Sequence, residues 1–185
     1  TLDLAVEYRL GPAGLAVRTE VTNCSDQSCP IGFGWHPYLY AFGGLVDDTV
    51  LTVPAGTAYR SDERGLPTGR FPVAGTEVDF GVGRPVGPAR LDVCFTDLER
   101  AADGKAVVGL ADPHGGGSAR LWVDQAYSHL MVFSGDTLAD PARRRRGLAV
   151  EPMTGAPNLL RTGDGLRTLD PGASCHALWG LEVFS

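Results

Sequence analysis

Glycine and proline interrupt this chain so often that a helical fold is excluded. The 185 residues include 25 Gly and 13 Pro, and turn-forming stretches recur at short intervals, as in residues 112–117 (Asp-Pro-His-Gly-Gly-Gly). Both residue types destabilise the interior of a helix, proline by removing a donor and glycine through its conformational entropy. No long stretch repeats its apolar residues with a helical period. The chain is therefore expected to fold as many short strands joined by turns.

The N-terminal residues alternate between apolar and polar side chains, which is typical of a half-buried strand. Residues 2–10 follow this pattern, residues 15–21 repeat it, and the turn sequence Gly11-Pro12-Ala13-Gly14 lies between them, so a β-hairpin is predicted. Further strands are expected at residues 50–53, 91–96, 107–111, 119–123, 130–133, 148–151 and 175–184. We predict an all-β fold, an antiparallel β-sandwich or barrel, with residues 1–185 forming one domain.

Composition excludes several classes of protein. Hydrophobic residues make up 43% of the chain and charged residues 21%, which is ordinary for a globular protein and too apolar for a disordered one. The net charge of -6 argues against a nucleic-acid partner. No apolar run approaches the ~20 residues that span a membrane, and no secretory signal precedes the first strand. We expect a cytoplasmic protein with its four cysteines as free thiols, and a chain that is incomplete at the N-terminus because it opens on Thr1.

Two stretches each place an ionisable residue directly before a proline. They are Gly34-Trp35-His36-Pro37-Tyr38 and Leu148-Ala149-Val150-Glu151-Pro152. Proline restricts the residue before it to extended backbone angles, which fixes the position of His36 and Glu151. A histidine and a glutamate held in this way can act as acid and base. The alternative is that both prolines only end strands, with His36 in a loop and Glu151 in solvent.

A carboxylate within a strand and several aromatic rings are further candidates for a functional site. Asp92 lies within an apolar strand, where a carboxylate is costly unless it is hydrogen-bonded or faces a cleft; an outward-facing position on a half-exposed strand is the alternative. Trp35, Tyr38 and Tyr40 can stack on a pyranose ring, although aromatic residues in a sandwich more often belong to the core.

The run Arg143-Arg144-Arg145-Arg146 is the strongest local concentration of charge. It can bind phosphate or another anion, but its place between Asp140-Pro141 and a strand favours a solvated loop tip. The glycines after His114 lack the sequence context of a phosphate-binding loop. Neither the histidines nor the cysteines have the spacing of metal ligands, so no metal site is predicted.

Five motifs in one order resemble those of the aldose 1-epimerase (galactose mutarotase) family, and the resemblance covers nearly the whole chain. The motifs are Phe33-Gly34-Trp35-His36-Pro37-Tyr38-Leu39, then Leu66-Pro67-Thr68-Gly69, then Thr76-Glu77-Val78-Asp79-Phe80, then Leu91-Asp92-Val93-Cys94-Phe95-Thr96, and finally residues 150–158. The closing stretch Gly163-Asp164-Gly165-Leu166, Leu169-Asp170-Pro171-Gly172 and Trp179 also resembles the C-terminal strands of that family.

The resemblance implies a galactose mutarotase-like supersandwich that interconverts the α and β anomers of a free hexose such as glucose or galactose, with no cofactor or metal. His36 would protonate the ring oxygen, Glu151 would take the proton from the anomeric hydroxyl, and Asp92 would bind sugar hydroxyls. Trp35 and Tyr38 would complete the binding site. We expect His36 and Glu151 to lie on opposite edges of one sugar-sized hollow, and the reaction to show a bell-shaped pH dependence.

Two departures from the family pattern keep other functions open. This chain begins after the N-terminal section in which family members carry an Arg and a further His, and Met131 stands where some relatives have a sugar-binding Gln. The alternatives are a non-catalytic carbohydrate-binding sandwich, a structural sandwich with idle motifs, and a sugar-phosphate mutarotase, which the arginine run only keeps open. The oligomeric state stays open.

Overall fold

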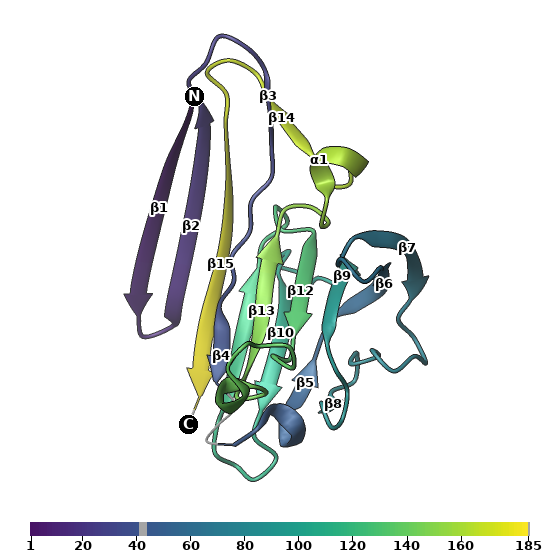
Figure 1. Cartoon of the computed structure of the whole chain (residues 1–185). Coiled ribbons are helices and arrows are strands. Elements are labelled where there is room, and N and C mark those ends of the chain that lie inside the picture. Colours follow the sequence, from purple (N-terminus) through teal and green to yellow (C-terminus); the bar gives the residue numbers. More distant parts are fainter. Residues whose placement is uncertain (41–43, 185) are drawn as a thin grey trace.

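Two antiparallel sheets packed face to face form the structure, a computed structural model that describes residues 1–40 and 44–184 (Figure 1). The seven-stranded sheet has the order β1-β2-β15-β11-β10-β5-β8, the six-stranded sheet has the order β4-β13-β12-β9-β6-β7, and β14 pairs with β3. The strands are β1 (Leu2–Gly11), β2 (Gly14–Asn23), β3 (Cys29–Ile31), β4 (Tyr38–Tyr40), β5 (Val50–Thr52), β6 (Ala55–Ser61), β7 (Pro67–Pro72), β8 (Arg84–Pro85), β9 (Asp92–Leu98), β10 (Ala106–Ala111), β11 (Ser118–Val123), β12 (His129–Phe133), β13 (Gly147–Met153), β14 (Arg167–Leu169) and β15 (Ser174–Phe184). Helical turns are short: η1 (Val46–Asp48), η2 (Pro141–Arg143) and α1 (Leu159–Thr162).

The core lies between the two large sheets and is built from the alternating residues of their strands. Val108 and Leu110 of β10 and Leu121 of β11 point inward from one sheet, and they meet Leu130 of β12 and Leu148 of β13 from the other. Each of these side chains is almost completely buried. The alternation of apolar and polar residues in the sequence therefore reflects the strands, each of which places every second residue in the core. The all-β antiparallel sandwich is confirmed.

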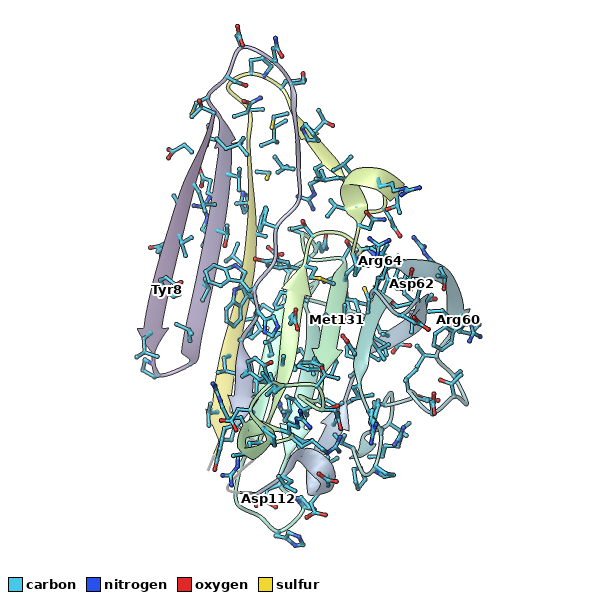
Figure 2. The ribbon with its side chains drawn as sticks, in the orientation of Figure 1. Tyr8, Arg60, Asp62, Arg64, Asp112 and Met131 are labelled. Atoms are coloured by element: carbon cyan, nitrogen blue, oxygen red, sulfur yellow. The ribbon has the colours of Figure 1, made fainter. Side chains whose placement is uncertain are left out.

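The outer face of the six-stranded sheet carries the residues that alternate with the core. Its strand register places Glu151 of β13 opposite Met131 of β12, and Met131 opposite Cys94 of β9. Figure 2 shows Met131 near the middle of this sheet. Tyr59 of β6 belongs to the same face, because Ala58 beside it pairs with Phe95 beside Cys94. This face positions the candidate site.

The predicted hairpin is present, but the burial of its first strand is not. The register of β1 and β2 runs from Leu2↔Asn23 to Gly11↔Gly14. The apolar side chains of β1 are nevertheless exposed, Leu4 by 61% and Leu10 by 84%. Among residues 1–40 and 44–184, β1 is the outermost strand of its sheet and pairs only with β2 (Figure 1). The prediction of a half-buried strand was wrong because alternation shows which face is apolar and not whether another layer covers it.

The remaining predicted strands are found within a few residues of their expected ends. The strand expected at residues 148–151 extends as β13 through Pro152 to Met153. Pro152 has no N–H to donate, but its carbonyl oxygen accepts a hydrogen bond from the backbone N–H of Trp35. Several strands were not predicted, among them the seven-residue β6, the three-residue β4 and the Pro- and Gly-containing edge strand β7. Among the described residues, no helix is long and apolar enough to cross a bilayer.

Candidate active site

Residues 33–37 run alongside β13, and this contact brings His36 next to Glu151. Trp35 donates its backbone N–H to the carbonyl oxygen of Pro152 at 2.9 Å, and Val150 donates to the carbonyl of Pro37 at 3.2 Å. Gly34 forms an isolated bridge with Met153, and a Cβ at Gly34 would lie 2.8 Å from the oxygen of Pro152. Glycine at position 34 is therefore required for this close approach.

His36 and Glu151 are in direct contact. The Nε2 atom of His36 lies 3.1 Å from the Oε1 atom of Glu151, with the imidazole side chain 54% exposed and the carboxylate side chain only 14% exposed. Both residues line a hollow of about 330 Å³. The two motifs distant in sequence thus converge, and Glu151 does not lie in open solvent. The expectation that a sugar-sized space separates the two groups was wrong, since they are adjacent.

Burial and a neighbouring carboxylate both favour the protonated form of Glu151. Burial is the larger cause of its raised pKa, the charge of Asp92 adds to it, and the charge of His36 opposes it. Asp92 is exposed at the start of β9, on the outer face of the six-stranded sheet. A base whose pKa is raised toward the working pH transfers protons more effectively. Through its charge, Asp92 thus contributes to the raised pKa of Glu151.

Tyr38 packs beside His36, and Trp35 is among the residues that line the hollow, although its indole ring packs elsewhere. The ring centroids of His36 and Tyr38 are 5.1 Å apart. The indole of Trp35 turns toward the seven-stranded sheet, where its Nε1 donates to Oγ1 of Thr19 at 3.0 Å and its ring packs 5.9 Å from that of Trp179. The structure thus brings His36, Glu151, Asp92 and Tyr38 together, and it places the Trp35 ring against core residues.

A second polar cluster on the same face was not predicted. Buried His129 contacts the hydroxyl of Tyr59 through Nε2 at 3.0 Å and the hydroxyl of Ser128 through Nδ1 at 2.8 Å. Tyr59 also donates to Asp164, which forms an ion pair with Arg70. Burial is the main cause of the lowered pKa of His129. Alternation along β12 puts His129 on the same face as Met131, and that was the one sequence signal for this cluster.

The described part of the chain contains no group of three or more His, Cys, Asp or Glu side chains arranged to hold a metal ion. The site contains an acid–base pair, His36 and Glu151. The carboxylate of Asp92 and the phenol of Tyr38 lie beside this pair. Such a set can move protons at a hydroxyl or ring oxygen.

Comparison with known proteins identifies the family and the fold of the chain. The family model for aldose 1-epimerase matches residues 1–178. The uncharacterized protein YihR of Escherichia coli K12 is 30% identical over 159 residues, which cover 86% of this chain and 48% of that protein. A galactose mutarotase-like protein of Clostridium acetobutylicum has the same fold, with a TM-score of 0.82 at 20% identity, covering 98% of this chain and 56% of that one.

The galactose 1-epimerase of Lactobacillus acidophilus also shares the fold, with a TM-score of 0.76 at 22% identity over 98% of this chain and 57% of that one. The chain thus spans about half the length of these relatives. The match of the family model extends over nearly all of the sequence and includes both proline-backed motifs. The chain belongs to the aldose 1-epimerase family.

Proposed function

We propose that this protein is an aldose 1-epimerase that interconverts the α and β anomers of a free hexose such as glucose or galactose. The observation that carries the proposal is the contact between His36 and Glu151 in one hollow. The anomeric hydroxyl oxygen and the ring oxygen of a pyranose are bonded to the same carbon. An acid and a base that act on them must therefore lie close together, as these two side chains do.

The reaction needs one proton to leave the substrate and one to enter it. The carboxylate of Glu151 takes the proton from the anomeric hydroxyl while protonated His36 gives one to the ring oxygen, and the bond between C1 and the ring oxygen breaks. The open-chain aldehyde then rotates about its C1–C2 bond. For closure, neutral His36 takes the proton from the attacking hydroxyl and protonated Glu151 returns one to the carbonyl oxygen, which restores both residues.

The neighbouring side chains fit a role in holding the sugar. Asp92 can accept hydrogen bonds from sugar hydroxyls, and Tyr38 offers an exposed ring and a hydroxyl beside His36.

We assign the reaction to the cytoplasm, because all four cysteines are free thiols in the structure and thiols persist in a reducing compartment.

Polarimetry of freshly dissolved α-D-glucose and α-D-galactose tests the proposal. The protein should accelerate mutarotation over buffer, and His36→Ala and Glu151→Gln should each lower the rate by roughly 10²–10⁴-fold, the usual contribution of a general acid or base. His114→Ala, on an exposed loop, is the matched control and should leave the rate unchanged. A rate equal to that of buffer would overturn the proposal. Sugar-dependent quenching of tryptophan emission without turnover would favour a carbohydrate-binding protein instead.

A further inference from the structure

A second hollow of about 580 Å³ lies beside the proposed catalytic pair. It is formed between β4 and the loop that follows β12, which crosses in front of β4 and β13 in Figure 1. Tyr38 and Tyr40 line one side, and Arg143 and Arg146 line the other. Because Tyr38 is also in ring contact with His36, this hollow adjoins the place where the anomeric carbon of a sugar would react.

The four consecutive arginines divide into two structural and two unpaired side chains. Arg145 is anchored by ion pairs with Asp47 and Asp136, and Arg144 donates to the carbonyl oxygen of Leu138 at 2.7 Å. Within the described residues, Arg143 and Arg146 form neither an ion pair nor a side-chain hydrogen bond, and these are the two that line the hollow. The prediction that the whole run is a solvated loop tip is therefore wrong for Arg145, whose side chain is only 15% exposed.

The charge of this hollow differs from that of the whole protein. The chain carries a net charge of -6, whereas the lining has two guanidinium groups and one carboxylate, that of Asp140. Asp140 already accepts the backbone N–H of Ala142 at 2.9 Å, as the cap of η2. The charge of Arg143 also reaches the proposed active site, because it opposes the rise in the pKa of Tyr38 that burial and Glu151 cause.

We propose that this hollow binds the phosphate group of a hexose phosphate whose anomeric carbon lies at His36 and Glu151. A phosphate monoester carries a charge of about -1.5 to -2 at neutral pH, which matches two guanidinium groups, and arginine binds such oxyanions through paired N–H donors. The inference rests on the proposed function and narrows it, since it makes a phosphorylated hexose a better substrate than the free sugar.

The test compares anomer exchange of glucose 6-phosphate and glucose by exchange NMR at equilibrium. The wild-type protein should show a kcat/KM at least tenfold higher for glucose 6-phosphate, roughly the effect of one charge-assisted hydrogen bond. The double variant Arg143→Gln/Arg146→Gln should lose this preference, so that its kcat/KM for glucose 6-phosphate falls to that for glucose. The double variant Arg64→Gln/Arg161→Gln removes the same charge at two exposed positions outside the hollow and should keep the preference. Equal kcat/KM values for the two sugars, or a preference that survives Arg143→Gln/Arg146→Gln, would overturn the inference.

Calorimetric titration separates this inference from the proposed function. If neither sugar is turned over, the epimerase proposal fails. Binding of glucose 6-phosphate that disappears in Arg143→Gln/Arg146→Gln would still support the anion site, and an absence of binding to the wild-type protein would overturn it. Glucuronate provides a further arm: binding as tight as that of glucose 6-phosphate would assign the site to a carboxylate and overturn the choice of phosphate.

Discussion

Met131 and Glu151 are direct cross-strand partners on the outer face of the six-stranded sheet. On its other side Met131 is paired with Cys94, and both side chains pack in one small apolar cluster with Tyr59 and Ala156. The outer face of the sheet beside Glu151 is therefore apolar across the two neighbouring strands β12 and β9. Cys94 is buried within this cluster, whereas Met131 is partly exposed. A sugar lying over this surface would therefore present hydroxyl groups to the Met131 thioether, which is a weak hydrogen-bond partner.

Met131→Gln should strengthen sugar binding. The amide would offer a donor and an acceptor to a sugar hydroxyl that otherwise loses its water, and one such hydrogen bond is worth roughly 0.5–1.5 kcal/mol. We expect KM for glucose to fall by about two- to tenfold with kcat little changed, measured by polarimetry. Met131→Leu keeps the apolar surface and is the control. An unchanged KM in Met131→Gln would show that the substrate does not lie over β12.

The pH dependence of mutarotation should report the charge of Asp92. Glu151 must be deprotonated to act as a base, so the rate falls as the pH drops through its pKa, which burial and Asp92 hold above the ordinary value of about 4.3. Asp92→Asn removes a negative charge that favours protonation of Glu151. The acidic limb of kcat/KM should therefore move to lower pH, in addition to any loss of sugar binding.

Polarimetry between about pH 4 and 8 checks this shift. Asp3→Asn, an exposed position on β1, is the matched control and should leave the acidic limb in place. A midpoint that stays the same or rises in Asp92→Asn would contradict the assignment of Glu151 as the base.

Periodicity predicted the strands well and their surroundings poorly. β10 and β11 were expected almost where they lie because both are flanked by turn residues and every second side chain is buried. The exposure of β1 depends on its position at the sheet edge, which alternation does not encode. The edge strands β4 and β7 are too short or too rich in Pro and Gly to show a period.

Only part of the candidate site could be predicted, because some of its contacts join residues that are distant in sequence. His36 and Glu151 were recognisable because each precedes a proline, and the ionisable residue and proline stand next to each other in sequence. The partners of His129 come from β6 and from the turn at Asp164, and only the folded register brings them together. The arginine run shows the same limit: four identical residues have different environments that their neighbours in sequence do not distinguish.

Arg145 should be the most stabilising member of that run. Its guanidinium bonds to Asp47, to Asp136 and to the carbonyl oxygens of Gly87 and Ala89. Arg145→Gln would leave the largely buried carboxylate of Asp136 without its main partner, and breaking such a pair costs roughly 3 kcal/mol. Urea unfolding should show this loss of stability.

Arg146→Gln serves as the control for this measurement, because its side chain is exposed and an exposed substitution changes stability by only about 0.5 kcal/mol. Similar unfolding midpoints for the Arg145→Gln and Arg146→Gln proteins would show that the ion pairs of Arg145 contribute nothing measurable.

Below neutral pH, stability should fall because of His129. Burial is the main cause that holds its pKa below the ordinary value of about 6.5; Asp164 opposes this effect and Arg70 adds to it. A histidine whose pKa is lowered on folding contributes stability that is present above about pH 6.5 and lost as the pH falls toward its folded pKa, since the unfolded chain takes up the proton first. Glu151 acts in the opposite sense, because its raised pKa gives stability that is lost as the pH rises through its folded pKa.

The measurement is therefore made on the Glu151→Gln protein, by urea unfolding between about pH 5 and 8. The free energy of unfolding should be constant above about pH 6.5 and decline below it. Adding His129→Gln should flatten this dependence, whereas His114→Gln, at an exposed position, should preserve it. If His129→Gln prevents folding, NMR titration of the His129 ring in the Glu151→Gln protein reads the pKa directly. A value at or above about 6.5, or stability that increases toward acid pH, would contradict the prediction, because a buried imidazole bonded between Tyr59 and Ser128 should resist protonation.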